Sequence, residues 1–525
     1  MTLYLRAMPA IDRTGALARA VARPGWLVTG SAAAATALLS ILGGEYRYYA
    51  MLPDNFNYIC YWQQIVDRSC NVTALQTPKP LTVVLFGVLH QLTGGLDFLT
   101  VIFVAAGVLA ATAAAILVEG TAGLSGSIAV IAFVVLNGAF LTGVLSGASE
   151  LLCAALILWL IARHTLGRRV RLPDWQTAVG LLLLGLIRPE NWLLSASVLF
   201  TTGLYLLLTS RHSMSLKSRL RSMARLPLLW AALPLVAAIL WIVFDLVAFG
   251  DPFFSFIRTD HFARLARAVN NLPFDAQWYN YPTEAYRLIR NQISPSVLGW
   301  AAIGLLILVY QRSPLLLLMG LPFGSALAAY WSAYLNRFIM FERFFLMNVV
   351  IILLLAALGW THAVKAVLGL RLDWLGRYSA VGCGAIRCLL LIVMALVLVY
   401  PARNVGRTFG PLDAERQFRL GDLAAAAAIQ RDENYEPNST IVVSVDNQTL
   451  VDWLLGRSGR DSVDITSWVL DGSSFGPDVK TAYFIGNSWA DEYLKRASLR
   501  GFDMAMIYSA GDVTLYRISR GTVGE

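Results

Sequence analysis

The feature that most constrains this chain is a series of long apolar runs, each separated from the next by a short polar or basic segment. An α-helix needs about 20 apolar residues to cross the hydrocarbon core of a bilayer. Inside that core only helices or closed barrels satisfy the backbone hydrogen bonds. The chain has 525 residues, of which 57% are hydrophobic and only 14% are charged. A soluble protein of this size needs far more surface charge, so the pattern predicts a polytopic α-helical membrane protein.

The basic residues indicate how the chain is oriented. The formal net charge is +9, and the positive residues gather in short segments between apolar runs. Cytoplasmic loops carry an excess of Lys and Arg, which explains this charge without a nucleic-acid partner. Four arginines precede the first apolar run, so we expect a cytoplasmic N-terminus; they are Arg6, Arg13, Arg19 and Arg23.

We expect about eleven spans, a location in the cell membrane and an extracytoplasmic C-terminus. The basic segments 163–171, 211–225 and 365–377 are expected to be cytoplasmic. The run Leu81–Leu92 is too short for a comfortable span, so we expect a re-entrant segment or a short helix at the outer face. The spans are expected near 26–43, 97–118, 124–146, 148–162, 227–248, 296–311, 314–333, 344–364 and 384–401, with two more helices in 177–209 that turn at residues 188–190.

Two domains are expected. Residues 1–402 would form the membrane domain, with large outer loops at 44–80 and 249–294. From about Arg403 the composition becomes that of a soluble protein, and residues 403–525 are expected to form a small extracytoplasmic α/β domain. β-branched and aromatic content predicts its strands. They are expected at 440–445, 481–485, 504–508 and 513–518, with helices at 414–430 and 490–497.

The first outer loop carries two candidate site residues. Asp54 is followed by a ring-rich stretch that includes Tyr58 and Trp62, which could form an amphipathic helix on the membrane surface. There Asp54 could accept a proton from a sugar hydroxyl, or it could simply cap a helix. Lys79 opens the next apolar run. It could hold a phosphate as a point charge or snorkel to the interface.

Further charges stand where apolar runs begin or turn. Glu150 starts one such run, where it could partner the helix dipole or belong to a polar site. Arg188 and Glu190 lie at the tip of the expected hairpin, where they could bind substrate or simply pair with each other. Cys60 and Cys70 share the first outer loop, and they could form a disulfide or remain free thiols.

The second large outer loop and the segment before the run at 344–364 supply the remaining candidates. Asp251 follows the expected span 227–248, and Arg258 comes shortly after it. Arg343 precedes a long apolar run on the same expected outer side. Clustered cations at an interface attract anionic lipid head groups. We find no metal-ligand spacing and no Gly-rich phosphate loop, so no cofactor is expected, and dependence on a divalent metal is left open.

Four motifs together resemble the GT-C superfamily of polyprenyl-phosphate-sugar glycosyltransferases, which includes the protein O-mannosyltransferase and aminoarabinose-transferase branch. They are Asp54 in the first outer loop, TPKPLTVVLFGVLHQLTG after it, LLLLGLIRPENWLL at the hairpin, and FGDP with ERFFLMNVVIILLLAALG further on. The resemblance covers nearly the whole membrane part. Two positions depart from it: Asp54 stands alone where many relatives carry an acidic pair, and Leu81 stands where relatives often have a second Pro.

The resemblance implies an inverting hexosyl- or pentosyltransferase that moves a sugar from a polyprenyl-phosphate donor to an extracytoplasmic glycan, lipid or protein. Asp54 would be the general base, and Lys79 with Arg258 or Arg343 would stabilise the phosphate. The other candidates would support or bind the substrates; they are Glu150, Arg188, Glu190 and Asp251. The alternative is a transporter or flippase of a lipid-linked or amphipathic substrate. A transporter should hold its charges near the bilayer midplane, whereas an enzyme should gather Asp54, Lys79 and Glu150 at one outer cavity.

Overall fold

The structure is a computed structural model. It describes residues 26–68, 70, 77–166, 175–198, 200, 216–260, 278–313, 315–335, 340–368, 388–389, 392, 409–443, 448–457, 463–464, 481–487, 502–510 and 513–520. The N-terminal arginines, the expected helix at 490–497, and most of the segments 365–377 and 384–401 lie outside these residues.

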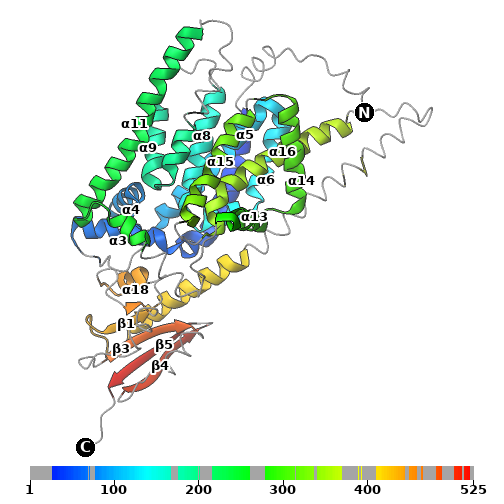
Figure 1. Cartoon of the computed structure of the whole chain (residues 1–525). Helices are drawn as coiled ribbons and strands as arrows, with labels where there is room; N and C mark the ends of the chain where they lie inside the picture. Colours follow the sequence, from blue (N-terminus) through cyan, green and yellow to red (C-terminus); the bar gives the residue numbers. More distant parts are fainter. Residues whose placement is uncertain are drawn as a thin grey trace, which may run out of the picture.

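A bundle of apolar helices forms the larger part of the molecule, and a small sheet lies beyond one end of it (Figure 1). Among the described residues, three helices are long and apolar enough to cross a membrane: α5 (Asp97–Ala122), α15 (Leu315–Leu335) and α16 (Leu346–Leu368) with the short η4 (Glu342–Phe345) before it. Three sharply bent helix pairs bring this to six if each pair is one span. The count of eleven spans therefore stays a prediction.

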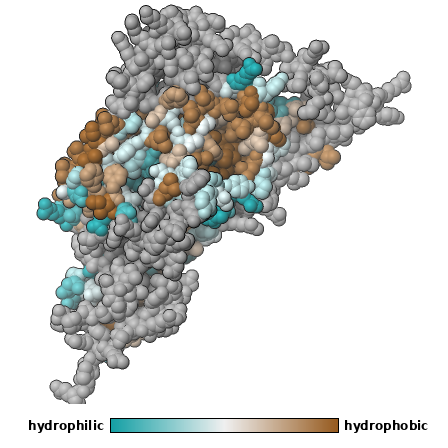
Figure 2. All heavy atoms as spheres, viewed as in Figure 1, coloured by the Kyte–Doolittle hydropathy of each residue, from teal (hydrophilic) through white to brown (hydrophobic). Residues whose placement is uncertain are grey.

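Large apolar side chains cover much of the surface of this bundle (Figure 2). Val101 on α5 is 67% exposed, and Val247 on α11 (Leu216–Phe249) is 78% exposed. Exposed apolar surface of this extent is unfavourable in water, whereas lipid tails solvate it. The chain is an integral membrane protein.

The expected span at 124–146 is not one continuous helix, and whether this segment crosses the membrane stays a prediction. The structure has two helices there, α6 (Leu124–Val135) and α7 (Gly138–Leu145), bent by 65°. Asn137 stands between them, and its side-chain oxygen accepts a hydrogen bond of 3.0 Å from the backbone N–H of Phe140. Asn is among the residues most favoured as N-caps, so a new helix starts where the apolar pattern alone indicates a continuous one.

A close backbone-to-backbone contact lies between α14 (Pro295–Tyr310) and α16. A Cβ at Gly304 would lie 1.9 Å from the carbonyl oxygen of Leu355, and a Cβ at Gly359 would lie 2.1 Å from that of Trp300. Both positions therefore require glycine, because small residues let membrane helices approach backbone to backbone. The nearby helix α13 (Tyr281–Gln292) meets α14 at 108°.

The first expected outer loop contains the helix α3, and α4 begins where this loop ends; each helix has a proline in its first turn, as the N1 preference predicts. Helix α2 (Trp26–Tyr46) and η2 (Arg47–Ala50) lead into α3 (Pro53–Val66), and α4 (Pro80–Thr93) follows. Helix α4 is short, as expected. The expected surface position of α3 is wrong, since residues 54–61 are buried against the bundle.

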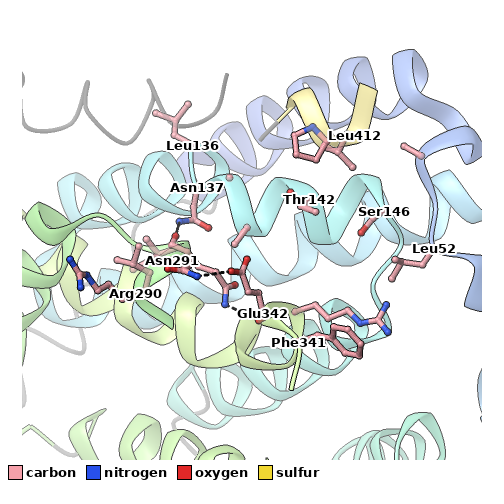
Figure 3. Close-up of a pocket in the computed structure, with 18 of the residues that line it drawn as sticks. Leu52, Leu136, Asn137, Thr142, Ser146, Arg290, Asn291, Phe341, Glu342 and Leu412 are labelled. Atoms are coloured by element: carbon pink, nitrogen blue, oxygen red, sulfur yellow. Dashed lines mark hydrogen bonds between the residues drawn. The ribbon is translucent and has the colours of Figure 1, made fainter. Parts of the chain in front are cut away.

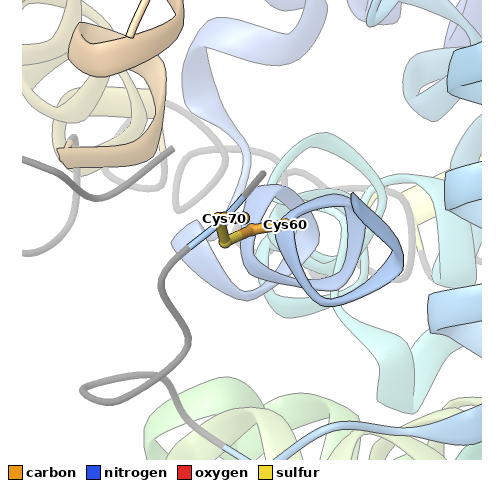
Figure 4. The surroundings of a disulfide bond; sticks show 2 residues. All are labelled: Cys60 and Cys70. Carbon is orange, nitrogen blue, oxygen red and sulfur yellow. A yellow bond between two sulfur atoms is a disulfide. The ribbon is translucent and has the colours of Figure 1, made fainter. Parts of the chain in front are cut away.

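Cys60 and Cys70 form a disulfide in the structure (Figure 4), one of the two alternatives left open by the sequence. Cys60 lies on α3, and Cys70 lies on the chain that leaves this helix. The bond therefore ties α3 to the segment that leads toward α4.

The expected hairpin is present. Helix α9 (Trp175–Ile187) ends just before Arg188, and residues 191–198 are helical again. Helix α8 (Ser149–Leu166) packs beside α9. Helix α11 starts at residue 216, so it takes up much of the expected basic loop 211–225. Beyond its end the helix Phe254–Asp260 turns away at 88°, and the short η3 (Trp278–Asn280) leads into α13.

The C-terminal part consists of a helix at 409–429, here called the linker helix, and a five-stranded sheet of order β2-β1-β3-β5-β4 (Figure 1). Strand β1 is parallel to β2 and β3, whereas β5 is antiparallel to β3 and β4. The two-residue β2 and the small α18 were not predicted. Their bounds are β1 Thr440–Val443, α18 Gln448–Leu454, β2 Val463–Asp464, β3 Thr481–Asn487, β4 Phe502–Ala510 and β5 Val513–Arg520.

Candidate active site

Six of the eight candidate residues meet in one cluster of ion pairs and hydrogen bonds. They come from five separate stretches of chain: the first turn of α3, the N-cap of α4, the first turn of α8, the turn after α9, and η4. The six are Asp54, Lys79, Glu150, Arg188, Glu190 and Arg343.

Arg188 is the buried centre of this cluster. Its side chain is 7% exposed, and it pairs with Glu150, which is 4% exposed. Its other nitrogens donate to Glu190 at 3.0 and 3.3 Å. The guanidinium also lies 4.8 Å from the ring centroid of Phe344. Arg188 and Glu190 thus do pair with each other, as one of the two readings of the hairpin tip expected, and Arg188 also holds the acid of α8.

Arg343 connects this buried pair to the candidate base. Its Nη2 lies 3.6 Å from Asp54 Oδ2, and its Nε lies 3.7 Å from Glu150 Oε1. The Arg343 side chain is 29% exposed, whereas that of Asp54 is 11% exposed. One planar guanidinium therefore bridges two carboxylates that are far apart in the sequence, a geometry that suits arginine better than lysine.

Lys79 is a further cation close to Glu150, which it reaches through Ser149. Its ammonium donates a 3.0 Å hydrogen bond to Ser149 Oγ, which lies 3.5 Å from Glu150 Oε2. It also lies 5.3 Å from the ring centroid of Tyr58, a favourable cation–π distance. Burial, with the positive charge of Arg188 second, lowers the Lys79 pKa to about 8. Lys79 is therefore a cation held at a polar site, and it does not simply snorkel outward.

Backbone contacts fix the start of α3 and thereby the place of Asp54. The N–H of Leu52 donates to Ser146 O at 2.6 Å, and Asn55 Nδ2 donates to Gly147 O at 3.1 Å. Gly147 has φ of +68°, and a Cβ there would lie 2.6 Å from Asn55 Nδ2. Only glycine fits this turn, which joins α7 to α8 and so sets Asp54 against Glu150.

Asp251 and Arg258 lie on the neighbouring segment. The Asp251 carboxylate accepts a 2.9 Å hydrogen bond from the N–H of Phe253 in its own turn. Arg258 lies 5.2 Å from the ring centroid of Phe254. The helix Phe254–Asp260 that carries it touches the residues just before Lys79, since Thr259 bonds to Thr77. The structure thus brings Arg258 to the side of the Lys79 segment, and a substrate contact of Asp251 or Arg258 stays a prediction.

Three residues of the site escaped the sequence reasoning. Ser149 receives Lys79, and Phe344 packs under Arg188 with the Tyr330 ring stacked on it at 5.4 Å. Ser149 directly precedes Glu150, and Phe344 directly follows Arg343. Both residues could have been predicted from the sequence, because each is the immediate neighbour of a candidate charged residue. Tyr330 carried no such signal.

A cavity of about 860 Å³ opens beside Asp54 and Arg343. In Figure 3 the side chains of Asn291 and Glu342 meet in its wall, joined by a 3.0 Å hydrogen bond, and Asn137 donates to the Gln292 carbonyl at 2.9 Å. Other parts of the wall come from α7, α13 and the linker helix; they include Thr142, Ser146, Arg290, Leu412 and Glu415. The cavity is thus polar on one side and reaches the candidate base.

Within the part of the chain that the structure describes, no three His, Cys, Asp or Glu residues gather as a metal site would require. The acids of the cluster are instead matched to arginines, because Glu150 contacts Arg188 and Asp54 contacts Arg343.

No protein-family model matches the sequence, and no curated protein matches it either. Solved structures do match. ArnT from Cupriavidus metallidurans bound to undecaprenyl phosphate aligns at 14% identity over 94% of this chain and 98% of that one, with a TM-score of 0.55. Its apo state aligns at 14% identity over 92% and 97%, with a TM-score of 0.53.

The Archaeoglobus fulgidus oligosaccharyltransferase tethered with an acceptor peptide aligns at 12% identity over 94% of this chain and 74% of that one, with a TM-score of 0.50. The described helices and the comparisons agree that this is a helical membrane protein that shares its fold with ArnT and the oligosaccharyltransferase, both GT-C glycosyltransferases. The resemblance inferred from the four motifs is thereby confirmed at the level of the fold.

Proposed function

We propose that this protein is an inverting membrane glycosyltransferase that moves a sugar from a polyprenyl-phosphate donor to an extracytoplasmic acceptor. The observation that carries the proposal is the meeting of Asp54, Arg343 and Lys79 in one cluster beside a large cavity. The GT-C fold adds support, and one structure that shares it was solved with undecaprenyl phosphate bound. A fold alone does not define a reaction, so the site carries the argument.

The phosphate of the donor would be held by cations. Lys79 bonds to Ser149 beside one carboxylate oxygen of Glu150, and Arg343 lies 3.7 Å from the other, so we expect the phosphate to bind at these two cations. Arg258, on the helix next to the Lys79 segment, would extend this positive surface. Donors fixed in advance act strongly where charge develops in a transition state. Here that charge develops on the phosphate as it leaves.

The reaction follows from this arrangement. The acceptor hydroxyl oxygen attacks the anomeric carbon, and a carbon–oxygen bond to the acceptor forms there. The bond from that carbon to the phosphate oxygen breaks, and its electron pair stays on the polyprenyl phosphate. The hydroxyl proton passes to the Asp54 carboxylate, which acts as the general base. A single displacement of this kind inverts the anomeric configuration.

The acceptor would enter through the cavity beside Asp54. Its polar wall, with Glu342, Asn291 and Arg290, suits a hydroxylated acceptor such as a glycan, a lipid head group or a peptide side chain. The ion pairs of Arg188 with Glu150 and Glu190 would fix the donor side and the acceptor side of the site relative to each other. The site would face the extracytoplasmic side, as the placement of the basic segments predicts.

The transporter alternative has one observation in its favour, the three bent helix pairs, since transporters bind substrates at discontinuous helices. The charges argue against it. Asp54 and Glu150 lie in the first turns of their helices, and Lys79 is an N-cap. They therefore gather at helix ends, where an interfacial enzyme needs them.

Reconstitution of the full chain in liposomes tests the proposal. The vesicles receive radiolabelled polyprenyl-phosphate sugars together with glycan, lipid or peptide acceptors. We expect label in an acceptor and an equal release of polyprenyl phosphate. Movement of intact donor between the leaflets, with no release of polyprenyl phosphate for any donor and acceptor pair, would support the transporter and contradict the transferase.

A further inference from the structure

The linker helix packs directly against the chain that leads to Asp54. Phe409 at its start stacks on Tyr46 with ring centroids 5.7 Å apart, and Arg416 lies 3.3 Å from Glu45. Leu412 joins Tyr46 in a buried apolar cluster with Ala50 and Leu145. The C-terminal part is thus attached at η2 and α2, immediately before α3.

The most buried contact of this interface is made by Arg419. Its side chain is fully buried, at 0% exposed. Its Nη1 donates a 2.6 Å hydrogen bond to the carbonyl oxygen of Met51, and its Nη2 lies 2.7 Å from Glu415 Oε1. The guanidinium lies 5.2 Å from the ring centroid of Phe56. A fully buried guanidinium is costly unless it is paired and hydrogen-bonded, so its position is tightly determined.

Met51 stands three residues before Asp54, and Phe56 lies two residues after it. Arg419 therefore touches the chain on both sides of the candidate base, at Met51 just before α3 and at Phe56 on α3. The next link, from the Leu52 N–H to Ser146 O, ties the same stretch to the turn before Glu150. Only the Met51 carbonyl and the Phe56 ring stand between Arg419 and the backbone at Asp54. A movement of Arg419 is therefore expected to move Asp54 without a flexible side chain absorbing it.

We propose that Arg419 is a positioning residue for the transfer reaction. Through Arg419 the C-terminal part helps to hold the general base, Asp54, in its reactive position. The inference rests on the proposed function, because it assigns Arg419 to the general base. Loss of Arg419 frees the Met51 carbonyl and lets the first turn of α3 shift. A displacement of about 1 Å at a reacting group can cost about 100-fold in rate.

The test compares Arg419→Met with Arg457→Met in the full chain. Methionine keeps much of the apolar stem over Phe56 and removes both donor bonds. Arg457 is a matched control, because it is also buried but bonds within the C-terminal part, to Ser439 O at 3.0 Å. Three quantities are measured for each variant: kcat, donor KM, and hydrogen exchange of the amides at residues 54–58.

For Arg419→Met we expect kcat to fall by about 10- to 100-fold, with donor KM within about twofold of the parent. We also expect faster exchange in the first turn of α3, where local opening becomes easier. Arg457→Met should change neither. If Arg419→Met fails to fold, Glu415→Ala replaces it, since it removes only the 2.7 Å partner of Arg419 and should speed the same exchange to a smaller degree.

Unchanged exchange at 54–58 in Arg419→Met overturns the inference, and so does a loss of kcat no larger than in Arg457→Met. The exchange measurement needs no turnover. If the parent protein shows no transfer from any donor, the proposed function fails while the exchange result still decides whether Arg419 anchors α3.

Discussion

The guanidinium of Arg343 lies 3.6 Å from the carboxylate of Asp54. The same guanidinium lies 3.7 Å from Glu150, so the candidate base and the buried acid of α8 are held at a fixed separation by one side chain. In the proposed reaction Arg343 orients the base and also faces the phosphate. Its removal should therefore affect catalysis more than folding.

For Arg343→Met we expect kcat/KM to fall by about 100-fold, the scale of losing one preorganised charge at a transition state. Arg343→Lys keeps the charge but not the planar fork, so it should recover only part of the rate. Arg287→Met is the control, because Arg287 is 59% exposed and pairs with Glu284 on α13. Transfer assays on purified variants decide, and equal rates for Arg343→Met and the control would remove Arg343 from the site.

Lys79→Ala should weaken use of the donor more than Lys79→Arg does. The positive charge serves the phosphate, and arginine restores the charge with a different reach and geometry. The measurement is kcat/KM for the lipid donor in both variants. Rates indistinguishable from the parent in both variants would mean that Lys79 does not bind phosphate.

Lys79 should also give the donor reaction an alkaline limit. Its pKa is lowered to about 8, so the charge is present below that pH and is lost above it, and kcat/KM should fall as pH rises through about 8. Lys79→Arg should lack this decline. The effect on stability has the opposite sign, because the cost of burying a charged lysine is relieved between pH 8 and the ordinary pKa. A decline that persists unchanged in Lys79→Arg would assign it to another group.

Arg188→Met should lower the free energy of unfolding by about 3–5 kcal/mol, because it removes the closest partner of the buried Glu150 and also breaks the pair with the partly exposed Glu190. Arg287→Met breaks only an exposed pair and should cost less than about 1 kcal/mol. Thermal or denaturant unfolding in detergent compares the two. Similar stability in both variants would show that the cluster is less buried in solution than the structure indicates.

The C-terminal sheet should lie outside the cell. Ser509→Cys on the exposed strand β4, in a background without free cysteines, should react with an impermeant maleimide in intact cells. Ser213→Cys, in the expected cytoplasmic segment 211–225, should react only after permeabilisation. The reverse pattern would invert the topology and place the site on the cytoplasmic side.

Much of the site could be predicted because its charges stand where helices begin or turn. Asp54, Glu150 and Lys79 each mark such a boundary in an apolar sequence, and an ionisable residue in that setting is a site candidate. The pairing of Arg188 with Glu150 could not be read in the same way. It joins the turn after α9 to the first turn of α8, and the spacing of apolar residues in the sequence does not predict which helix ends lie close together in the fold.

The errors in the fold have a similar cause. Hydropathy makes 124–146 one apolar run, and only the capping geometry at Asn137 reveals the break. The ring-rich pattern of α3 is that of a surface helix, but the bundle and the linker helix cover it. Arg419 lies in a segment of ordinary amphipathic composition, so its contact with Met51 becomes visible only in three dimensions.

Replacement of Asp54 by asparagine tests the central claim most directly. The amide keeps the shape of the side chain and removes the basicity that general-base catalysis requires. Asp97→Asn, at an exposed acid in the first turn of α5 that is outside the candidate site, is the matched control. With a radiolabelled polyprenyl-phosphate sugar in liposomes, we expect no detectable transfer by folded Asp54→Asn protein that still binds the donor, and substantial transfer by the control. Near-normal turnover by Asp54→Asn would contradict the account and move the base to another residue.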